Sequence, residues 1–342
     1  MENLLKKMLK EKKEKELMKL NAIEIVNVLF KELQEREKDI LSRRFALKDK
    51  DYQTLEEIGN LHNLTRERIR QIERSSLKKL KKIEELSEHL DVMRDLVSKL
   101  LEEHGGLMEK DFLLDILSVL FIKANGSTVG FDRKIYKNNL DFILSEILDD
   151  HIDKVDNSDK FAVSYKIKDQ AIEYFEKMAD ELKDKIKDIK KTMHFEELVE
   201  VLRGLKSFSD YKNNLLNKAG KELDLKYIFK DEIFPEWADI INKNKSFYSF
   251  MQAVKGINPN IFGHWGSDDS AEIKPKRIAD KIYLILKNEE KPMHFSKITE
   301  KINETGFDHK KVSQGSVHNE LILDDRYILV DRGIYSLKDW GK

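Results

Sequence analysis

The chain has 342 residues, 37% of them charged, with 14 glycines, 4 prolines and no cysteine. This composition is typical of a helix-rich protein with short connections, and the lack of cysteine excludes disulfide bonds and thiolate chemistry. Because 63 Lys and Arg balance 64 Asp and Glu to a net charge of −1, a nucleic acid would have to be held by a local basic patch. The length allows two to four domains at the usual ~100–200 residues each.

Residues 1–21 are rich in Lys and Glu, and we expect a charged helical arm there. The segment is too highly charged for a secretory signal, and no apolar stretch is long enough to span a bilayer. We therefore expect a cytoplasmic, nucleoid-associated protein without membrane contact.

From residue 22 to residue 90, apolar residues recur at three- and four-residue spacing, which predicts a compact helical domain. Within it, residues 55–72 fit a helix-turn-helix. Gly59 stands where the two helices would cross. Asn63 occupies the turn, where a left-handed backbone is needed and Asn tolerates it. Thr65 is a natural N-cap for the second helix.

The second helix of this motif predicts a surface that reads DNA. Between Thr65 and Lys82 there are eight basic residues against Glu67 and Glu73, a net charge of +6. The side chains that lie away from the buried stripe, in the half that enters a major groove, are Arg66, Glu67, Arg70, Gln71 and Arg74. Arg pairs with guanine, Gln with adenine, and Glu accepts from cytosine. A solvated basic face is the alternative, but a charge run alone would not also place Gly59 and Asn63 correctly.

Residues 28–83, with the motif TRERIRQIE at 65–73, resemble region 4 of the primary bacterial sigma factors, the module that reads the promoter −35 element. The resemblance implies base contacts for Arg66, Glu67 and Gln71, with Arg70 packed against the bases. Contacts with the phosphate backbone are expected for Arg36, Arg44, Thr54, Leu55, Glu56, Thr65, Arg68, Arg74 and Lys78. The apolar surface around Phe45 would hold the flap-tip helix of the RNA polymerase β subunit.

Two positions depart from the family pattern. Ser75 stands where the family usually has a phosphate-contacting lysine, and Arg74 beside it could substitute. Ala46 replaces the usual glycine after the Arg-Phe pair, close to the expected polymerase contact. No segment resembles the sigma region that binds the −10 element and melts DNA, so we expect the chain not to be a complete sigma factor.

Three later segments share a pattern that leads from a polar stretch through a methionine (Met108, Met193 and Met293) into an amphipathic helix. The pattern predicts winged-helix-like units at 95–170, 171–268 and 274–342. Turn signals predict hairpin wings in the first and last of these units, whereas the middle unit shows no clear wing. The last unit, closing with RGIYSLKDW, resembles the HARE-HTH winged helix of the delta subunit of bacterial RNA polymerase, and the resemblance assigns no ligand to it.

Neither a catalytic nor a metal site is predicted. The nine histidines include no pair at metal-ligand spacing backed by a carboxylate, and GSTVG at 126–130 lacks the lysine of a phosphate-binding loop. We therefore expect a mainly α transcription regulator, not an enzyme, that needs no cofactor. It would bind double-stranded DNA, read −35-like elements through the helix starting at Thr65, and contact RNA polymerase; no oligomeric state is indicated.

Two alternatives to this hypothesis stay open. One is a delta-like accessory subunit of RNA polymerase that docks on the β flap without reading bases. The other is a DNA-binding component of a restriction or mobile-element system.

Overall fold

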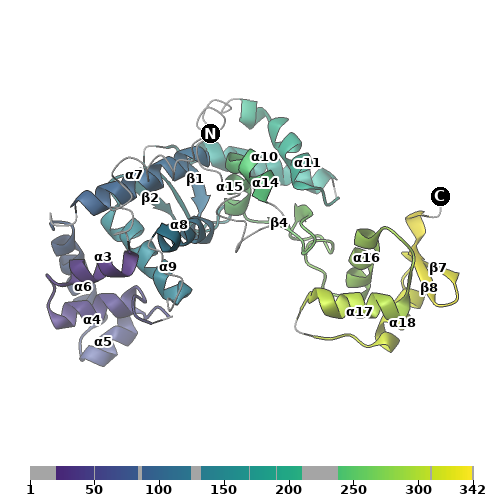
Figure 1. The fold of residues 1–342 in the computed structure, drawn as a ribbon, viewed down its shortest axis with the longest axis horizontal. Coiled ribbons are helices and arrows are strands. Elements are labelled where there is room, and N and C mark those ends of the chain that lie inside the picture. The colour runs from purple at the N-terminus through teal and green to yellow at the C-terminus, as the bar shows by residue number, and fades with distance from the viewer. Residues whose placement is uncertain are drawn as a thin grey trace. The chain divides into compact units, whose positions relative to one another are not determined.

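A computed structural model describes residues 21–49, 51–83, 87–124, 132–168, 170–189, 191–209, 238–308 and 310–340. The helical arm expected at 1–21 therefore falls, except for its last residue, outside the described residues. The chain divides into two compact units, Met1–Phe175 with Asp210–Val254, and Glu176–Ser209 with Lys255–Lys342. In both units helices dominate and the strands are short and antiparallel (Figure 1). This confirms the predicted mainly α fold with a helix-turn-helix and small β wings.

The described part of the first unit begins with the helices α3 (Ala22–Phe30), α4 (Glu35–Arg44), α5 (Leu55–His62) and α6 (Arg66–Leu80). Three of these helices start at a side chain that accepts a backbone N–H of the first turn, namely Asn21, Thr54 and Thr65. At the start of α4, the Glu37 carboxylate accepts the N–H of Gln34 at 2.9 Å, one half of a capping box. Local sequence therefore sets where these helices begin.

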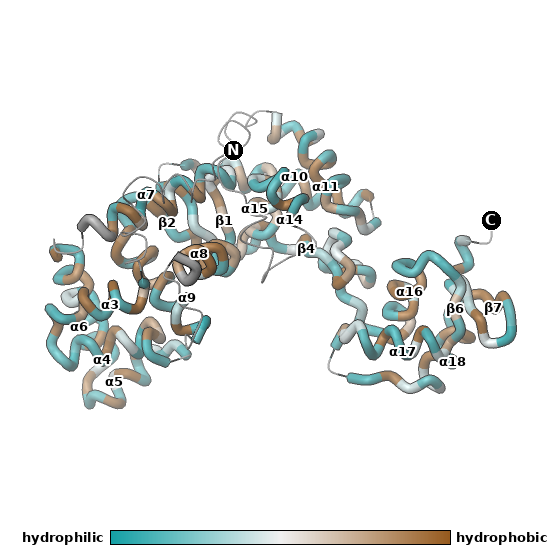
Figure 2. The backbone as a smooth tube through the Cα atoms, viewed as in Figure 1, coloured by the Kyte–Doolittle hydropathy of each residue, from teal (hydrophilic) through white to brown (hydrophobic). Residues whose placement is uncertain are grey.

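The rest of the first unit consists of α7 (Ser87–Glu103), β1 (Leu107–Glu109), α8 (Lys110–Ala124), α9 (Arg133–Phe142), the π-helical turn η2 (Ile143–Ile147), β2 (Ile152–Val155), β3 (Ser164–Ile167), α14 (Ala238–Lys243) and α15 (Lys245–Ala253). The strands form an antiparallel sheet in the order β1-β3-β2, with Met108 opposite Tyr165. α8, hydrophobic over most of its described length (Figure 2), packs against β1 and α9. α15 packs on β1 as well.

The C-terminal part of the second unit repeats this order of elements. It consists of α16 (Ile278–Glu289), β6 (Met293–His294), α17 (Phe295–Thr305), α18 (Gln314–Leu323), β7 (Tyr327–Asp331), β8 (Ile334–Leu337) and a final 3-10 turn, η3 (Lys338–Trp340). The strands again lie in the order first, last, middle, β6-β8-β7, and Met293 is opposite Tyr335. A buried cluster that includes Ile285, Ile298 and Val317 joins the three helices.

The middle part of the chain contains a hairpin that the sequence pattern does not reveal. α10 (Glu173–Ile189) and α11 (Phe195–Arg203) are followed, further along the chain, by the antiparallel pair β4 (Ile257–Pro259) and β5 (Trp265–Ser267). Met193 forms an isolated bridge with Trp265, so all three methionines face an aromatic residue of a hairpin. Three-residue strands, one of them ending in proline, are too short to show the alternation by which strands are recognised.

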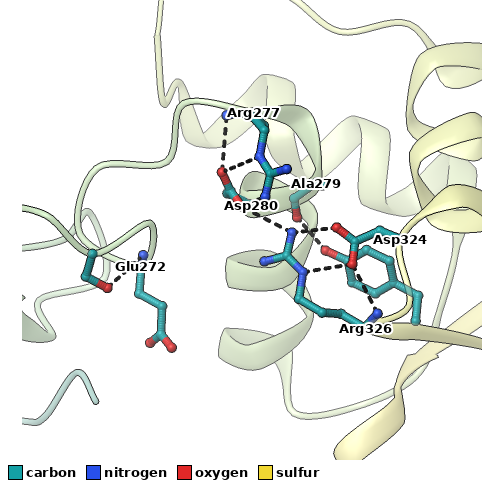
Figure 3. Close-up of polar contacts among 8 residues, drawn as sticks. Glu272, Arg277, Ala279, Asp280, Asp324 and Arg326 are labelled. Atoms are coloured by element: carbon teal, nitrogen blue, oxygen red, sulfur yellow. Dashed lines mark hydrogen bonds and ion pairs between the residues drawn. The ribbon is translucent and has the colours of Figure 1, made fainter. Parts of the chain in front are cut away.

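Arg326 ties the start of β7 to the start of α16 (Figure 3). Its Nη2 atom lies 2.8 Å from an Asp324 oxygen and 3.1 Å from an Asp280 oxygen, and Arg277 pairs with the same Asp280 at 3.3 Å. The Tyr327 hydroxyl donates to the Ala279 carbonyl. Hydrogen bonds to charged groups in part-buried positions fix geometry as well as adding stability. This network therefore fixes the position of the β7–β8 hairpin relative to α16.

Buried polar groups join α15 to the end of α7. The Lys245 ammonium lies 3.1 Å from the Glu103 carboxylate, and both side chains are at most 7% exposed. Next to this pair, Nδ1 of His104 lies 2.5 Å from the Ser249 hydroxyl. Burial, together with the nearby Lys245 cation, lowers the pKa of His104 to about 3. The imidazole of the folded protein is therefore neutral at neutral and mildly acidic pH.

Replacing His104 tests this burial. Between pH 6.5 and about 3 the unfolded chain binds a proton at His104 that the folded chain does not, so the residue makes stability fall with decreasing pH by up to about 1.4 kcal/mol per pH unit. We expect the difference in unfolding free energy between wild type and His104→Asn to shrink from pH 6.5 to pH 5, as measured by urea unfolding. Ser249→Ala, which keeps the buried imidazole, should retain the wild-type slope. A difference that stayed constant with pH would contradict a neutral, buried His104.

Candidate nucleic-acid interface

A small apolar core holds α6 against α4 and α5. Ile40, Ile58 and Ile69, one from each helix, are fully buried. Three partly buried side chains pack around them, Leu55, Leu64 and Ile72. Each buried aliphatic side chain contributes about 1.5–3 kcal/mol relative to an exposed one. This core turns the apolar stripe of α6 inward, as its periodicity predicts, and leaves the opposite face outward.

The turn between α5 and α6 has the predicted geometry. Asn63 adopts a left-handed backbone, with φ 53° and ψ 45°. The N–H of Leu64 donates to the Gly59 carbonyl at 2.9 Å, which closes the C-terminal end of α5. A Cβ atom at Gly59 would lie 2.7 Å from the Leu64 carbonyl oxygen, closer than real Cβ contacts allow. The expected roles of Gly59 and Asn63 are thus confirmed.

The outer face of α6 is open to solvent over its first three turns. The exposed residues that we predicted to contact DNA from this helix are Arg66, Glu67, Arg68, Gln71, Arg74 and Lys78. The interior of the protein covers none of them, so the face has the access that a groove-binding helix requires.

Some of these side chains pair with one another. Arg70 is half-buried and forms a two-fold contact with Glu67, with N···O distances of 2.7 and 2.5 Å, and hydrogen bonding from Arg70 lowers the pKa of the Glu67 carboxyl. Arg68 donates to Gln71 at 3.1 Å. Solvent screens exposed pairs of this kind, which therefore add little to stability, so exchanging them for contacts with bases costs little.

The residues expected at phosphates lie at helix ends around α6. Arg36, exposed near the start of α4, donates to the His62 carbonyl at 3.2 Å. Arg44, half-buried at the end of α4, donates to the Gln53 carbonyl at 3.3 Å, and its Nε atom is 3.6 Å from Glu73. Apart from those on the outer face of α6, the other residues expected at phosphates lie at the starts of α5 and α6: Thr54, Leu55, Glu56 and Thr65. Backbone N–H groups at a helix N-terminus bind anions, which explains how Leu55 can act there while its side chain packs inward.

Phe45 lies at the C-terminal end of α4 and is covered by its own chain. Its ring packs edge-on against Phe142 of α9, with 4.9 Å between ring centroids. Asn138 and Asn139 of α9 bind the Ala46 and Leu47 carbonyls, which follow Phe45, and the sequence does not reveal them as partners. They are 92 positions from the backbone groups that they bind, and no periodicity indicates which two surfaces of a chain will meet.

The helix α18 of the second unit differs from α6 in its chemistry. α18 has the same place in its unit that α9 has in the first, but it contains no Lys or Arg, and Ile322 and Leu323 at its end are exposed. Across the ranges that the structure describes, no helix is both long and apolar enough to cross a membrane. The same ranges contain no cluster of three or more metal-binding side chains.

Comparison with known proteins gives the class of this module. Residues 29–82 match the family model described as Sigma-70, region 4. The relatives include the RNA polymerase sigma factor SigA1 of Synechococcus elongatus, 57% identical over 49 residues, which are 14% of this chain and 12% of the relative. SigA of Clostridium acetobutylicum is 41% identical over 78 residues, 22% of this chain and 20% of the relative. RpoD of Helicobacter pylori is 55% identical over 51 residues, 15% of this chain and 8% of the relative.

The helix-turn-helix thus belongs to the class of DNA-binding modules by which sigma factors read promoters. Residues 29–82 are a Sigma-70 region 4 domain. The chain spans only about a tenth to a fifth of the length of the curated relatives it matches. No solved structure matches it.

Replacing Gly59 tests the close crossing of the two helices. In Gly59→Ala the new methyl group would meet the Leu64 carbonyl oxygen at 2.7 Å, so the helices must separate. We expect a loss of about 1–3 kcal/mol of stability in this module, measured by hydrogen exchange of the amides in α5 and α6, together with weaker DNA binding. Asn60→Ala, at the exposed next position of α5, is the matched control and should be nearly neutral. Equal exchange rates in the two variants would contradict the crossing.

Proposed function

We propose that the protein is a sequence-specific transcription regulator that binds double-stranded DNA, reads −35-like elements through α6 and associates with RNA polymerase. The observation that carries the proposal is the exposed basic face of α6, held outward by the core around Ile69. The region 4 match supports it, because this face is the one that the family places in the major groove.

Recognition would divide between bases and phosphates. Arg66, Glu67 and Gln71 would bond to base edges, each good paired contact adding ~1–3 kcal/mol of discrimination, and Arg70 would pack against the bases. Arg68, Arg74 and Lys78 of α6, with Arg36, Arg44 and the starts of α5 and α6, would hold the phosphates. Phosphate contacts add affinity that is independent of sequence and decreases with salt. In this proposal the protein needs no cofactor and catalyses no reaction.

The proposal extends to the domains and partners of the chain. We take the segments 95–170, 171–268 and 274–342 as winged-helix-like, the last of them HARE-HTH-like. The shared element order of the first and last, and the shared pairing of a methionine with an aromatic residue, support this. The proposed partner besides DNA is the β-subunit flap of RNA polymerase, through Phe45, which implies a nucleoid-associated protein.

A second candidate function is an accessory polymerase subunit that docks without reading bases. One observation favours it: Ile322 and Leu323 expose an apolar end of α18, more than half of each side chain being accessible, and exposed apolar groups are typical of protein contacts. It leaves the basic face of α6 without a role, however, and for that reason we place it second.

Removing two base contacts tests the proposed reading of DNA. In Arg66→Ala/Gln71→Ala the core of the motif is untouched, so the protein should still fold and bind DNA weakly through phosphates. We expect its preference for a duplex with a −35 element over a scrambled duplex to fall at least tenfold, measured by competition in fluorescence anisotropy. Lys31→Ala, at an exposed lysine that directly follows α3 and lies outside the proposed interface, is the control. Undiminished selectivity in the double variant would exclude α6 as the reading helix.

A phosphate contact should respond differently. Lys78→Ala is expected to weaken binding to both duplexes by the same factor, because a phosphate contact carries no sequence information. The slope of log affinity against log salt should become shallower by about one. The measurement is a salt titration of both duplexes, and a loss confined to one duplex would show that Lys78 reads bases.

A further inference from the structure

The apolar surface at the end of α4 is occupied by α9. We define the Phe45 surface as Phe30, Phe45, Ala46 and Leu47. Phe142 of α9 inserts its ring between the two aromatic residues, with centroids 4.9 Å from Phe45 and 6.1 Å from Phe30, edge-on to both. Ala46 and Leu47 are at most 4% exposed. An aromatic side chain in such a position contributes by burial and by the edge-on geometry.

Two amide side chains make the contact specific. Asn138 and Asn139 donate from Nδ2 to the carbonyls of Ala46 and Leu47, at 3.0 and 2.9 Å. These carbonyls follow the end of α4, where Ala46 has a φ of 52° and the helix no longer provides hydrogen-bond donors. At the rim, the Tyr52 hydroxyl donates to Asn138 at 3.0 Å. α9 thus binds the Phe45 surface with an aromatic side chain and, about one turn away, two amide donors.

α9 contacts other parts of the first unit along its length. In the first unit α9 comes after α7, β1 and α8 and before the hairpin of β2 and β3. The recognition helix of a winged helix has this position. Of the three basic residues of α9, Arg133 and Lys137 pair with Asp115, at 2.9 and 2.7 Å, and Lys134 pairs with Asp51 at 3.1 Å. Its far end faces the Phe45 surface, so the helix makes a protein contact.

We propose that α9 competes with RNA polymerase for the Phe45 surface. In the closed form, which the structure shows, α9 occupies it. In the open form α9 leaves, and a helix of an external protein with the same chemistry takes its place. This inference rests on the proposed function, under which the external helix is the flap tip of the polymerase β subunit.

Reading of DNA and docking of the polymerase are separable in this arrangement. The outer face of α6 is exposed while α9 is in place, so closure does not prevent base contacts. Closure weakens the binding of polymerase, because the apparent affinity is the intrinsic affinity multiplied by the fraction of molecules in the open form. The closed protein would thus occupy DNA without recruiting polymerase.

Weakening the α9 contact tests the competition in the full-length protein. Asn138→Ala/Asn139→Ala removes both bonds to the carbonyls and leaves the Phe45 surface intact. We expect this variant to bind RNA polymerase core enzyme about tenfold more tightly than wild type, since the two hydrogen bonds lost from the closed form are worth about that factor together. Amide exchange in 133–142 should accelerate, and affinity for the −35 duplex should not change. Adding Phe45→Ala should abolish the gain.

A matched control and a milder variant keep the test independent of folding. Asn303, in the other unit, donates its amide to the Val312 carbonyl at 3.1 Å, so Asn303→Ala removes a similar bond away from the surface and should not alter polymerase binding. Tyr52→Phe removes only the rim bond to Asn138 and should tighten polymerase binding by a smaller factor.

The outcomes separate this inference from the proposed function. Unchanged or weaker polymerase binding by a folded double variant, or no binding by any variant, overturns the competition, while selective DNA binding would still stand. Tighter polymerase binding together with absent DNA selectivity supports the competition and overturns the reading of DNA.

Discussion

The close crossing of α5 and α6 at Gly59 is the constraint on which the rest of the helix-turn-helix domain depends. We call this domain, which comprises α3 to α6, the head. The crossing allows the three isoleucines of the core to meet, and that contact fixes the rotation of α6 about its own axis. The rotation in turn decides that Ile69 points inward and Arg66 and Gln71 point outward. A basic helix without this support could bind phosphates, because phosphate binding requires no fixed orientation of the helix. It could not distinguish base sequences, because contacts with base edges do require one.

The head has two surfaces with different chemistry, and the protein treats them differently. The basic face of α6 is left to solvent, where charged side chains need no partner. The apolar surface around Phe45 is closed by an aromatic ring and two amides from the same chain. Large exposed apolar surfaces are rare on proteins and mark sites of protein contact. The same physical chemistry thus explains why one surface is open and the other is covered.

The sequence predicted those features that depend on nearby residues. Gly59, Asn63 and the cap Thr65 act within a few positions of themselves, so residue type and spacing suffice to recognise them. The exposed face of α6 follows from helical periodicity. The three methionines were recognised as equivalent because each leads into an amphipathic helix.

Features that join distant parts of the chain could not be predicted. The contacts of Asn138 and Asn139 with the end of α4, and of His104 with Ser249, connect residues far apart in sequence. Nothing in a single sequence identifies such partners. The hairpin at Ile257–Ser267 is not predictable for a different reason. Its strands have three residues each, which is too short to show an alternating pattern. Within the stretch 171–268, α15 packs on β1 of the first compact unit, whereas α10 from Glu176 onward and the hairpin belong to the second.

The two asparagines of α9 bond to main-chain carbonyls, and every amino acid has such a carbonyl. These two hydrogen bonds need no particular side chain at position 46 or 47, where burial of both residues and the φ of 52° at Ala46 set the limits on residue type. The helix-turn-helix could therefore be exchanged during evolution for a related domain with the same backbone course at these positions, while the rest of the first unit stays the same.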